Sequence, residues 1–177
     1  MKIKTDDIFE FAKLRIACHV RALNYFAEMF NMQFPEHDGD KNIEPSRTGH
    51  AYIIYAMYHK NFHIPDEYEQ LCLDAKQHHR EHASHHMLHY KNTADIPDTR
   101  IYEMVCDWAS ANFERRKILR AENALSLNDW FKQNKSELDW TPHQLDLIKK
   151  ALKIINENID ETKVKSFWEP LLELTDL

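Results

Sequence analysis

Residues 6–30 read DDIFEFAKLRIACHVRALNYFAEMF, and this stretch decides the fold class. Its apolar side chains recur mostly every three or four positions, which is the period of an amphipathic helix. Asp6 or Asp7 can cap this helix at its start, and we expect the helix to run to about Asn31. The sequence therefore predicts a long helix that buries one face.

One polar residue interrupts the apolar stripe of this helix. At helical spacing the stripe contains Ala12, Ile16, His19, Leu23, Phe26 and Phe30. The histidine therefore points inward. A buried histidine can simply bond to a backbone carbonyl, so His19 alone does not establish a binding site.

Glycine content extends the helical interpretation to the whole chain. The 177 residues include 2 glycines, too few for the hairpin turns of sandwiches and barrels or for phosphate-binding loops. With 43% apolar residues the chain can form a compact core. We expect an all-α fold, with a helical core over residues 1–120 and a helical extension over residues 121–177 packed on it.

Capping residues and apolar periodicity place the other helices. We expect a second helix from about Thr48, a third from Pro65 and Asp66 through the histidine-rich stretch to about Tyr90, and a fourth from Asp98 or Thr99 to about Arg120. Shorter helices should follow, one from Ser126 through Trp130 and one from Thr141 and Pro142 through Ile155. A last helix should run from Glu161 to Leu174 with an interruption near Pro170.

Charge and cysteine content exclude several classes of protein. A formal charge of −6 without a long basic run excludes an extended nucleic-acid surface. The three cysteines have no C-x-x-C spacing, which favours a reducing, cytoplasmic setting over a disulfide framework. No apolar run is long enough for a membrane span or a signal peptide, so we expect no membrane partner and no export.

Residues 77–90, QHHREHASHHMLHY, hold six histidines between His78 and His89. If the helix continues through them, His79, His82 and His86 extend one apolar stripe, and His78, His82, His85 and His89 extend the adjoining one. So many inward imidazoles need partners, which predicts metal ligation. The alternative is a solvated or pH-responsive helix face. We expect His79 and at least one of His85 and His86 to face the cavity, with His89 and His143 outside the ligand set.

Two further segments carry carboxylates beside these histidines. The segment HDGDK, residues 37–41, places His37 next to Asp38, and such a pair can turn toward one ion. Taken alone, the segment is explained equally well as a solvated turn capped by Asp38 and Asp40. The segment EMVCDW, residues 103–108, places Asp107 on the inward side of a helix. A buried carboxylate needs a cation there, either a metal ion or an arginine such as Arg80 or Arg100.

In this order and on separate helices, these segments resemble the metal-dependent HD superfamily. More closely, they resemble an uncharacterised family of short phage and bacterial proteins with segments that read approximately HD-x-S-K, a histidine-rich stretch and E-M-V-x-D-W. Here Asp40 replaces the usual serine, and residues 81–84 lack the usual asparagine. The resemblance covers roughly residues 10–115, and the tail after Arg120 is expected to be peculiar to this chain.

The resemblance implies an HD-like helical bundle with a metal centre. The implied ligands are His19, His37, Asp38 and Asp107 for one ion, and His79 with His85 or His86 for a second ion bridged by Asp38. Mixed nitrogen and oxygen ligands suit Mn, Fe, Co, Ni or Zn, as one or two ions. Lys41 and Arg80 are candidates to hold phosphate oxygens. Glu81 is a candidate to orient water or a ligating histidine.

The leading functional hypothesis is a metal-dependent phosphohydrolase in which Asp38 helps to create the nucleophile. The expected partner is a small phosphorylated molecule, with a nucleotide as the commonest choice in the resembling superfamily. A homodimer is a further candidate assembly. One alternative is a di-iron oxygenase on the same scaffold. Another is a non-enzymatic phage or bacterial accessory protein that binds a nucleotide or a host protein.

Overall fold

The computed structural model describes residues 4–134 and 139–175, which form an all-α fold without strands. The α-helices are α1 (Thr5–Glu28), α2 (Ser46–Tyr58), α3 (Asp66–His82), α4 (Asp98–Phe113), α5 (Leu127–Asn134), α6 (Pro142–Asn158), α7 (Glu161–Ser166) and α8 (Glu169–Leu172). Short 3₁₀ turns lie at η1 (Gly39–Asn42), η2 (Met87–His89) and η3 (Thr93–Asp95), and a π turn, η4 (Glu114–Ile118), continues α4.

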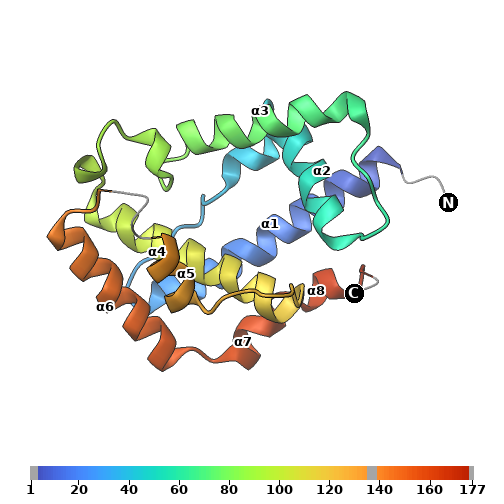
Figure 1. Cartoon of the computed structure of the whole chain (residues 1–177). Helices are drawn as coiled ribbons and strands as arrows, with labels where there is room; N and C mark the ends of the chain where they lie inside the picture. The colour runs from blue at the N-terminus through green and yellow to red at the C-terminus, as the bar shows by residue number, and fades with distance from the viewer. Residues whose placement is uncertain (1–3, 135–138, 176–177) are drawn as a thin grey trace.

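Helix α1 runs through the middle of the molecule and packs against both α2 and α4 (Figure 1). The predicted stripe is its buried face: Ala12, Ile16, His19, Leu23 and Phe26 are each at most 4% exposed. Burial of these apolar side chains stabilises the helix in its position. The inward orientation of His19 is therefore fixed by the packing of its stripe neighbours.

Helices α2 and α3 approach each other closely at Gly49. A Cβ atom built at this residue would lie 2.5 Å from the Ala75 Cβ and 2.5 Å from the Leu71 carbonyl oxygen. Only glycine therefore permits this helix–helix distance. The contact holds α3, and with it His79, against the rest of the bundle.

The C-terminal helices pack onto both central helices. Helix α6 lies against α4, and α8 lies against α1 (Figure 1). The predicted cap of α6 is confirmed, since the Thr141 side chain accepts a hydrogen bond from the Gln144 amide. The predicted interruption near Pro170 is also confirmed, because α7 ends at Ser166 and α8 begins at Glu169.

The prediction that the third helix continues through the histidine-rich stretch is wrong. Helix α3 ends at His82, and Ala83 is extended. The carbonyl groups of the last turn find other donors, since His82 Nδ1 donates to the His78 oxygen at 2.8 Å and His89 Nδ1 donates to the Glu81 oxygen at 3.1 Å. Histidine side chains thus satisfy the end of the helix, and the residues that follow form a loop.

A buried ion pair fastens α1 to the end of α4, close to His19. The Arg15 guanidinium donates to both carboxylate oxygens of Glu114, with an Nε–Oε1 distance of 2.9 Å. The Tyr58 hydroxyl donates to the same Oε1 at 2.5 Å. Burial raises the pKa of Glu114, but the Arg15 charge outweighs burial and holds this pKa below its usual value.

Among the described residues, no helix is long and apolar enough to cross a membrane.

Gly49→Ala should destabilise the protein by about 1–3 kcal/mol, because a methyl group there forces α2 and α3 apart. Helix propensity alone predicts the opposite sign. Gly39→Ala is the matched control, since its Cβ would meet nothing closer than 3.8 Å. Urea titration measures the free energy of unfolding of each protein. A Gly49→Ala protein at least as stable as wild type would contradict the close approach of α2 and α3.

Glu114→Gln should lower the free energy of unfolding by about 3–5 kcal/mol, because it leaves the Arg15 charge buried without its partner. Glu161→Gln, which removes the exposed partner of Lys117, should cost less than about 1 kcal/mol.

The wild-type pair also predicts a pH dependence. Because the folded pKa of Glu114 lies below the usual 4.5, its stabilisation is present above pH 4.5 and is lost as the pH falls through the folded pKa. Glu114→Gln should therefore lose less stability than wild type on acidification. Equal acid sensitivity of the two proteins in urea titrations would contradict this assignment.

Candidate metal centre

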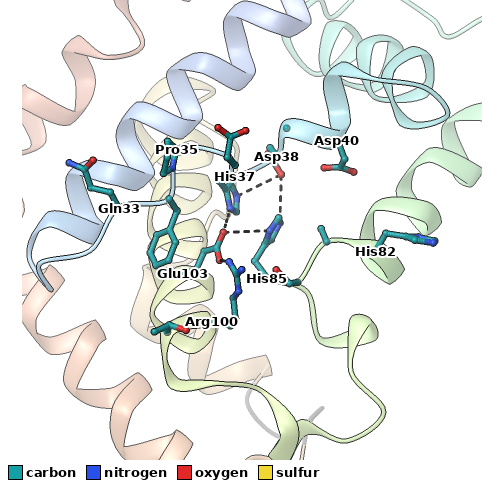
Figure 2. Close-up of a pocket in the computed structure, with 15 residues that line it drawn as sticks. Gln33, Pro35, His37, Asp38, Asp40, His82, His85, Arg100 and Glu103 are labelled. Carbon is teal, nitrogen blue, oxygen red and sulfur yellow. Dashed lines mark hydrogen bonds and ion pairs between the residues drawn. The ribbon is translucent and has the colours of Figure 1, made fainter.

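Five segments bring histidines and carboxylates to one buried place. Helix α1 supplies His19 and helix α4 supplies Asp107, while His37 and Asp38 lie in the connection that follows α1. Helix α3 and the loop after it supply the other imidazoles, which belong to His79, His85 and His86. Figure 2 shows His37, Asp38, His85 and Glu103 turned toward one another across the space between these segments.

The first group of candidate ligands surrounds Asp107. Its Oδ1 lies 3.0 Å from His19 Nε2 and 3.7 Å from His37 Nε2. All three ligand atoms lie within 4.8 Å of one another. Ligand atoms around one tetrahedral ion with bonds of about 2.1 Å are separated by about 3.4 Å. The three side chains can therefore bind a single ion.

The second group lies on the other side of Asp38. The His79, His85 and His86 rings each offer a nitrogen within 4.8 Å of the other two. Asp38 Oδ1 lies 3.3 Å from His79 Nε2 and 3.6 Å from His85 Nε2. Three imidazoles and one carboxylate oxygen make a nitrogen-rich site for a transition metal.

Asp38 joins the two groups. Its Oδ1 lies near His79 and His85 of the second group and also 3.7 Å from His37 Nε2, whereas its Oδ2 lies 3.9 Å from His19 Nε2 and 2.7 Å from Lys41 Nζ. His37, Asp38 and His85 form a further group whose ligand atoms lie within 4.8 Å of one another. The residue adopts a left-handed backbone conformation with φ 61°, which aspartate tolerates better than most residues. Its side chain is 2% exposed. The fold thus holds one carboxylate, buried and locally strained, between two sets of imidazoles.

Carboxylates behind two of the histidines fix which ring nitrogen faces the centre. His37 Nδ1 donates to Glu103 Oε1 at 3.0 Å, and His79 Nδ1 donates to Asp40 Oδ2 at 2.8 Å. In each ring Nδ1 therefore carries a proton and Nε2 faces the centre, where it can bind a metal once it is unprotonated. This arrangement is typical of metal-binding histidines.

His19 follows the same pattern through a hydroxyl group. Ser110 Oγ donates to the His19 carbonyl oxygen at 3.2 Å, which leaves Oγ to accept from His19 Nδ1 at 3.0 Å. His19 Nε2 lies 3.0 Å from Asp107 Oδ1, within hydrogen-bond distance. Both atoms face the centre, so both could serve as ligands of an ion when the ring nitrogen carries no proton.

Unsatisfied polar atoms at the centre fit the same conclusion. His37 Nε2, His85 Nε2 and Asp38 Oδ1 are buried and have no hydrogen-bond partner among the described residues. Leaving such atoms unpaired costs about 1–3 kcal/mol each. All three belong to one ligand cluster, so the residues present fit a bound divalent transition metal.

The charges around the centre and the burial of its side chains determine the pKa values of its histidines and carboxylates. Burial lowers the pKa of His37, but Asp38, Asp107 and Glu103 outweigh burial and raise this pKa to about 9. Burial and the His37 charge lower the pKa of His85 to about 2. Burial would raise the pKa of Asp38, but Lys41 and the imidazoles hold it well below its usual value. Metal binding at neutral pH would therefore displace a proton from His37.

The structure does not bring Arg80 or Glu81 to the centre. Both are exposed on α3, where Glu81 bonds to the Gln77 side chain. Successive helical residues are about 100° apart, so both point away from the direction of His79. His89 bonds to the backbone of α3, and His143 pairs with Asp98 at 3.0 Å on the surface, so neither lies among the candidate ligands.

The sequence did not predict the present role of four residues at the centre. They are Asp40, Glu103, Ser110 and Arg100, which orient the ligands or line the site. Glu103 begins the EMVCDW segment and lies one turn before Asp107, so helical spacing could have indicated it. The alternative pairing of Asp107 with Arg80 or Arg100 is not found, since Asp107 contacts His19 and His37, while Arg100 bonds to Glu103.

A cavity of about 560 Å³ opens beside the centre. Its walls include His37, Asp38 and His85 as well as Arg100 and Glu103 (Figure 2). Small-molecule sites commonly have volumes of about 300–1,000 Å³. The cavity therefore offers a small molecule direct access to the candidate ligands.

The fold and this cluster define an all-helical protein with a candidate metal centre beside a small-molecule cavity. The chain belongs to a family of unknown function (DUF5662), whose model matches residues 12–161. No curated protein and no solved structure matches the chain. Because the family match continues to residue 161, the expectation that the tail after Arg120 is peculiar to this chain is wrong for most of that tail.

Glu103→Gln should weaken metal binding by about 10–100-fold, because it removes the charge that holds the His37 ring. Competition with a chromogenic chelator measures this affinity. His143→Ala is the matched control, since His143 is exposed and pairs with Asp98 on the surface. Unchanged affinity in Glu103→Gln, or an equal loss in His143→Ala, would contradict the assigned ligand set.

Proposed function

We propose that this protein is a metal-dependent phosphohydrolase that acts on a small phosphorylated molecule, with a nucleotide as the first candidate. The observation that carries the proposal is the position of Asp38 between two groups of imidazoles, each able to hold an ion. The resemblance of His19, His37–Asp38 and Asp107 to the ligands of the HD superfamily supports the same reaction class. The candidate metals are Mn, Fe, Co, Ni and Zn.

A bound divalent ion would supply a water of lowered pKa and would polarise a phosphoryl oxygen. The residues of the chain prepare this chemistry. Lys41 Nζ, 2.7 Å from Asp38 Oδ2, favours the ionised form of the carboxylate. Glu103 and Asp40 hold the rings of His37 and His79, so that ligand positions need little rearrangement during the reaction.

Arg100 replaces Arg80 as the arginine available to a substrate. It lines the cavity, and its side chain is 39% exposed while it bonds to Glu103. A guanidinium has five N–H donors, so this bond leaves others free to contact a substrate oxygen. Lys41 is engaged with Asp38, and we assign it to the positioning of that carboxylate rather than to direct phosphate binding.

A di-iron oxygenase is the second candidate, and the nitrogen-rich surroundings of the second group favour it. His79, His85 and His86 suit iron as well as zinc or nickel. Iron content and a charge-transfer absorption band in aerobically purified protein separate the two enzyme classes. Two irons with such a band and no release of phosphate from any phosphorylated metabolite would favour the oxygenase.

Asp38→Ala should abolish phosphohydrolase activity and leave a folded helical protein, because the apolar faces of the helices do not involve this residue. Turnover on the best substrate from a screen of phosphorylated metabolites, metal content and far-ultraviolet circular dichroism are measured on both proteins. His143→Ala again serves as the control and should keep its turnover, since His143 lies on the surface outside the cavity lining. Equal turnover of Asp38→Ala and wild type with metal bound would exclude this mechanism and favour the accessory-protein alternative.

A further inference from the structure

The wall of the cavity has an excess of negative charge. Four carboxylates line it, those of Glu36, Asp38, Asp40 and Glu103, whereas Arg100 is its one cationic side chain apart from the histidines. Three of the carboxylates have cationic or imidazole partners: Asp38 pairs with Lys41, Asp40 with His79, and Glu103 with His37 and Arg100. Glu36 is exposed and has no ion-pair partner among the described residues.

The positive charge that is not balanced by a carboxylate partner is therefore confined to a metal-loaded centre, since the charge of Arg100 is balanced by Glu103 even where its remaining N–H groups can contact a ligand. Two divalent ions would add four positive charges, of which Asp38 and Asp107 offset two, leaving roughly the charge that balances one phosphate group. Away from the centre, the guanidinium of Arg100 already bonds to Glu103, and Glu36 adds an unpaired negative charge. The outer cavity thus repels a second anionic group.

We propose that the cavity selects phosphate monoesters whose organic part is neutral or cationic, and discriminates against ligands with a second anionic group. The inference rests on the proposed function and specifies its substrate class. A mononucleotide, with one phosphate and a neutral nucleoside, meets this requirement. Nucleoside diphosphates and triphosphates do not, because they carry further anionic phosphate groups, which the excess negative charge of the cavity wall disfavours.

Direct binding tests the charge preference without relying on turnover. Full-length protein loaded with Mn²⁺ is titrated by calorimetry with inorganic phosphate and with three monoesters: phosphoethanolamine, glycerol phosphate and phosphoglycerate. They share one phosphate and carry a cationic, a neutral and an anionic organic part, respectively. Phosphoethanolamine should bind at least as tightly as glycerol phosphate, and phosphoglycerate about 3- to 10-fold more weakly than glycerol phosphate.

Glu36→Lys provides the test specific to the cavity wall. It reverses the unpaired charge without changing a candidate ligand, so the ratio of phosphoglycerate to glycerol phosphate affinity should rise by about 3- to 10-fold. Glu122→Lys is the matched control. It makes the same change of charge in the exposed segment that follows η4, at the opposite end of α4 from Arg100. The ratio of phosphoglycerate to glycerol phosphate affinity should therefore stay at the wild-type value.

The outcomes separate this inference from the function on which it rests. If inorganic phosphate does not bind the metal-loaded protein, the proposed function and the inference both fail. If phosphate binds but the three esters bind equally, or if Glu36→Lys leaves their ratio unchanged, the charge preference is wrong and the phosphohydrolase proposal stands.

Discussion

The Asp38 carboxylate is the constraint around which the rest of the structure is organised. It is buried, and imidazoles lie within 4 Å of both its oxygens: His19 at Oδ2, and His37, His79 and His85 at Oδ1. An unpaired carboxylate in such a place is strongly destabilising, so the surroundings must supply positive charge. Lys41 supplies one charge at Oδ2, and the lone pairs of the imidazoles create a place for metal ions. Burying this carboxylate costs free energy, and a bound cation lowers that cost, so the same burial favours cation binding at the site.

The helices hold this arrangement by packing on their other faces. The buried Arg15–Glu114 pair joins α1 to the end of α4. Arg15 lies one turn from His19 on α1, and Glu114 lies one turn after Ser110 of α4. Helix α3 is held by the close approach at Gly49, which fixes the position of His79. The rigid helices thus carry His19, His79 and Asp107, while two connections bring the other candidate ligands to them.

Sequence periodicity predicted the helices well and the histidine-rich stretch poorly. Apolar spacing placed α1, α4 and α6 because packing dominates those segments. The end of α3 at His82 depends on hydrogen bonds from His82 and His89 to backbone carbonyls, and no periodic pattern reports such bonds. The sequence singled out His85 and His86, but the loop rather than a helical stripe turns them to the centre. Helical spacing from Asp107 could have indicated Glu103, whereas the contact of Asp40 with His79 is visible only once tertiary contacts are known.

The family match and the geometry address different questions. Membership of a family of unknown function covers most of the chain but assigns no chemistry to it. The proposed chemistry rests on the clustered imidazoles and carboxylates, the side chains that orient them and the cavity beside them. The proposed substrate preference rests in turn on the four carboxylates of the cavity wall and on the candidate ligands at His37, Asp38 and His85.

Anomalous X-ray diffraction from crystals of untagged protein grown with Mn²⁺ or Zn²⁺ tests the metal centre most directly. The account predicts one anomalous peak about 2.0–2.3 Å from His19 Nε2, His37 Nε2 and an Asp107 oxygen, and a second peak among His79, His85 and His86. Both peaks should adjoin the Asp38 carboxylate. Peaks confined to the half-buried His78 and exposed His82 rings, with the Asp38 surroundings empty at saturating metal, would contradict the account.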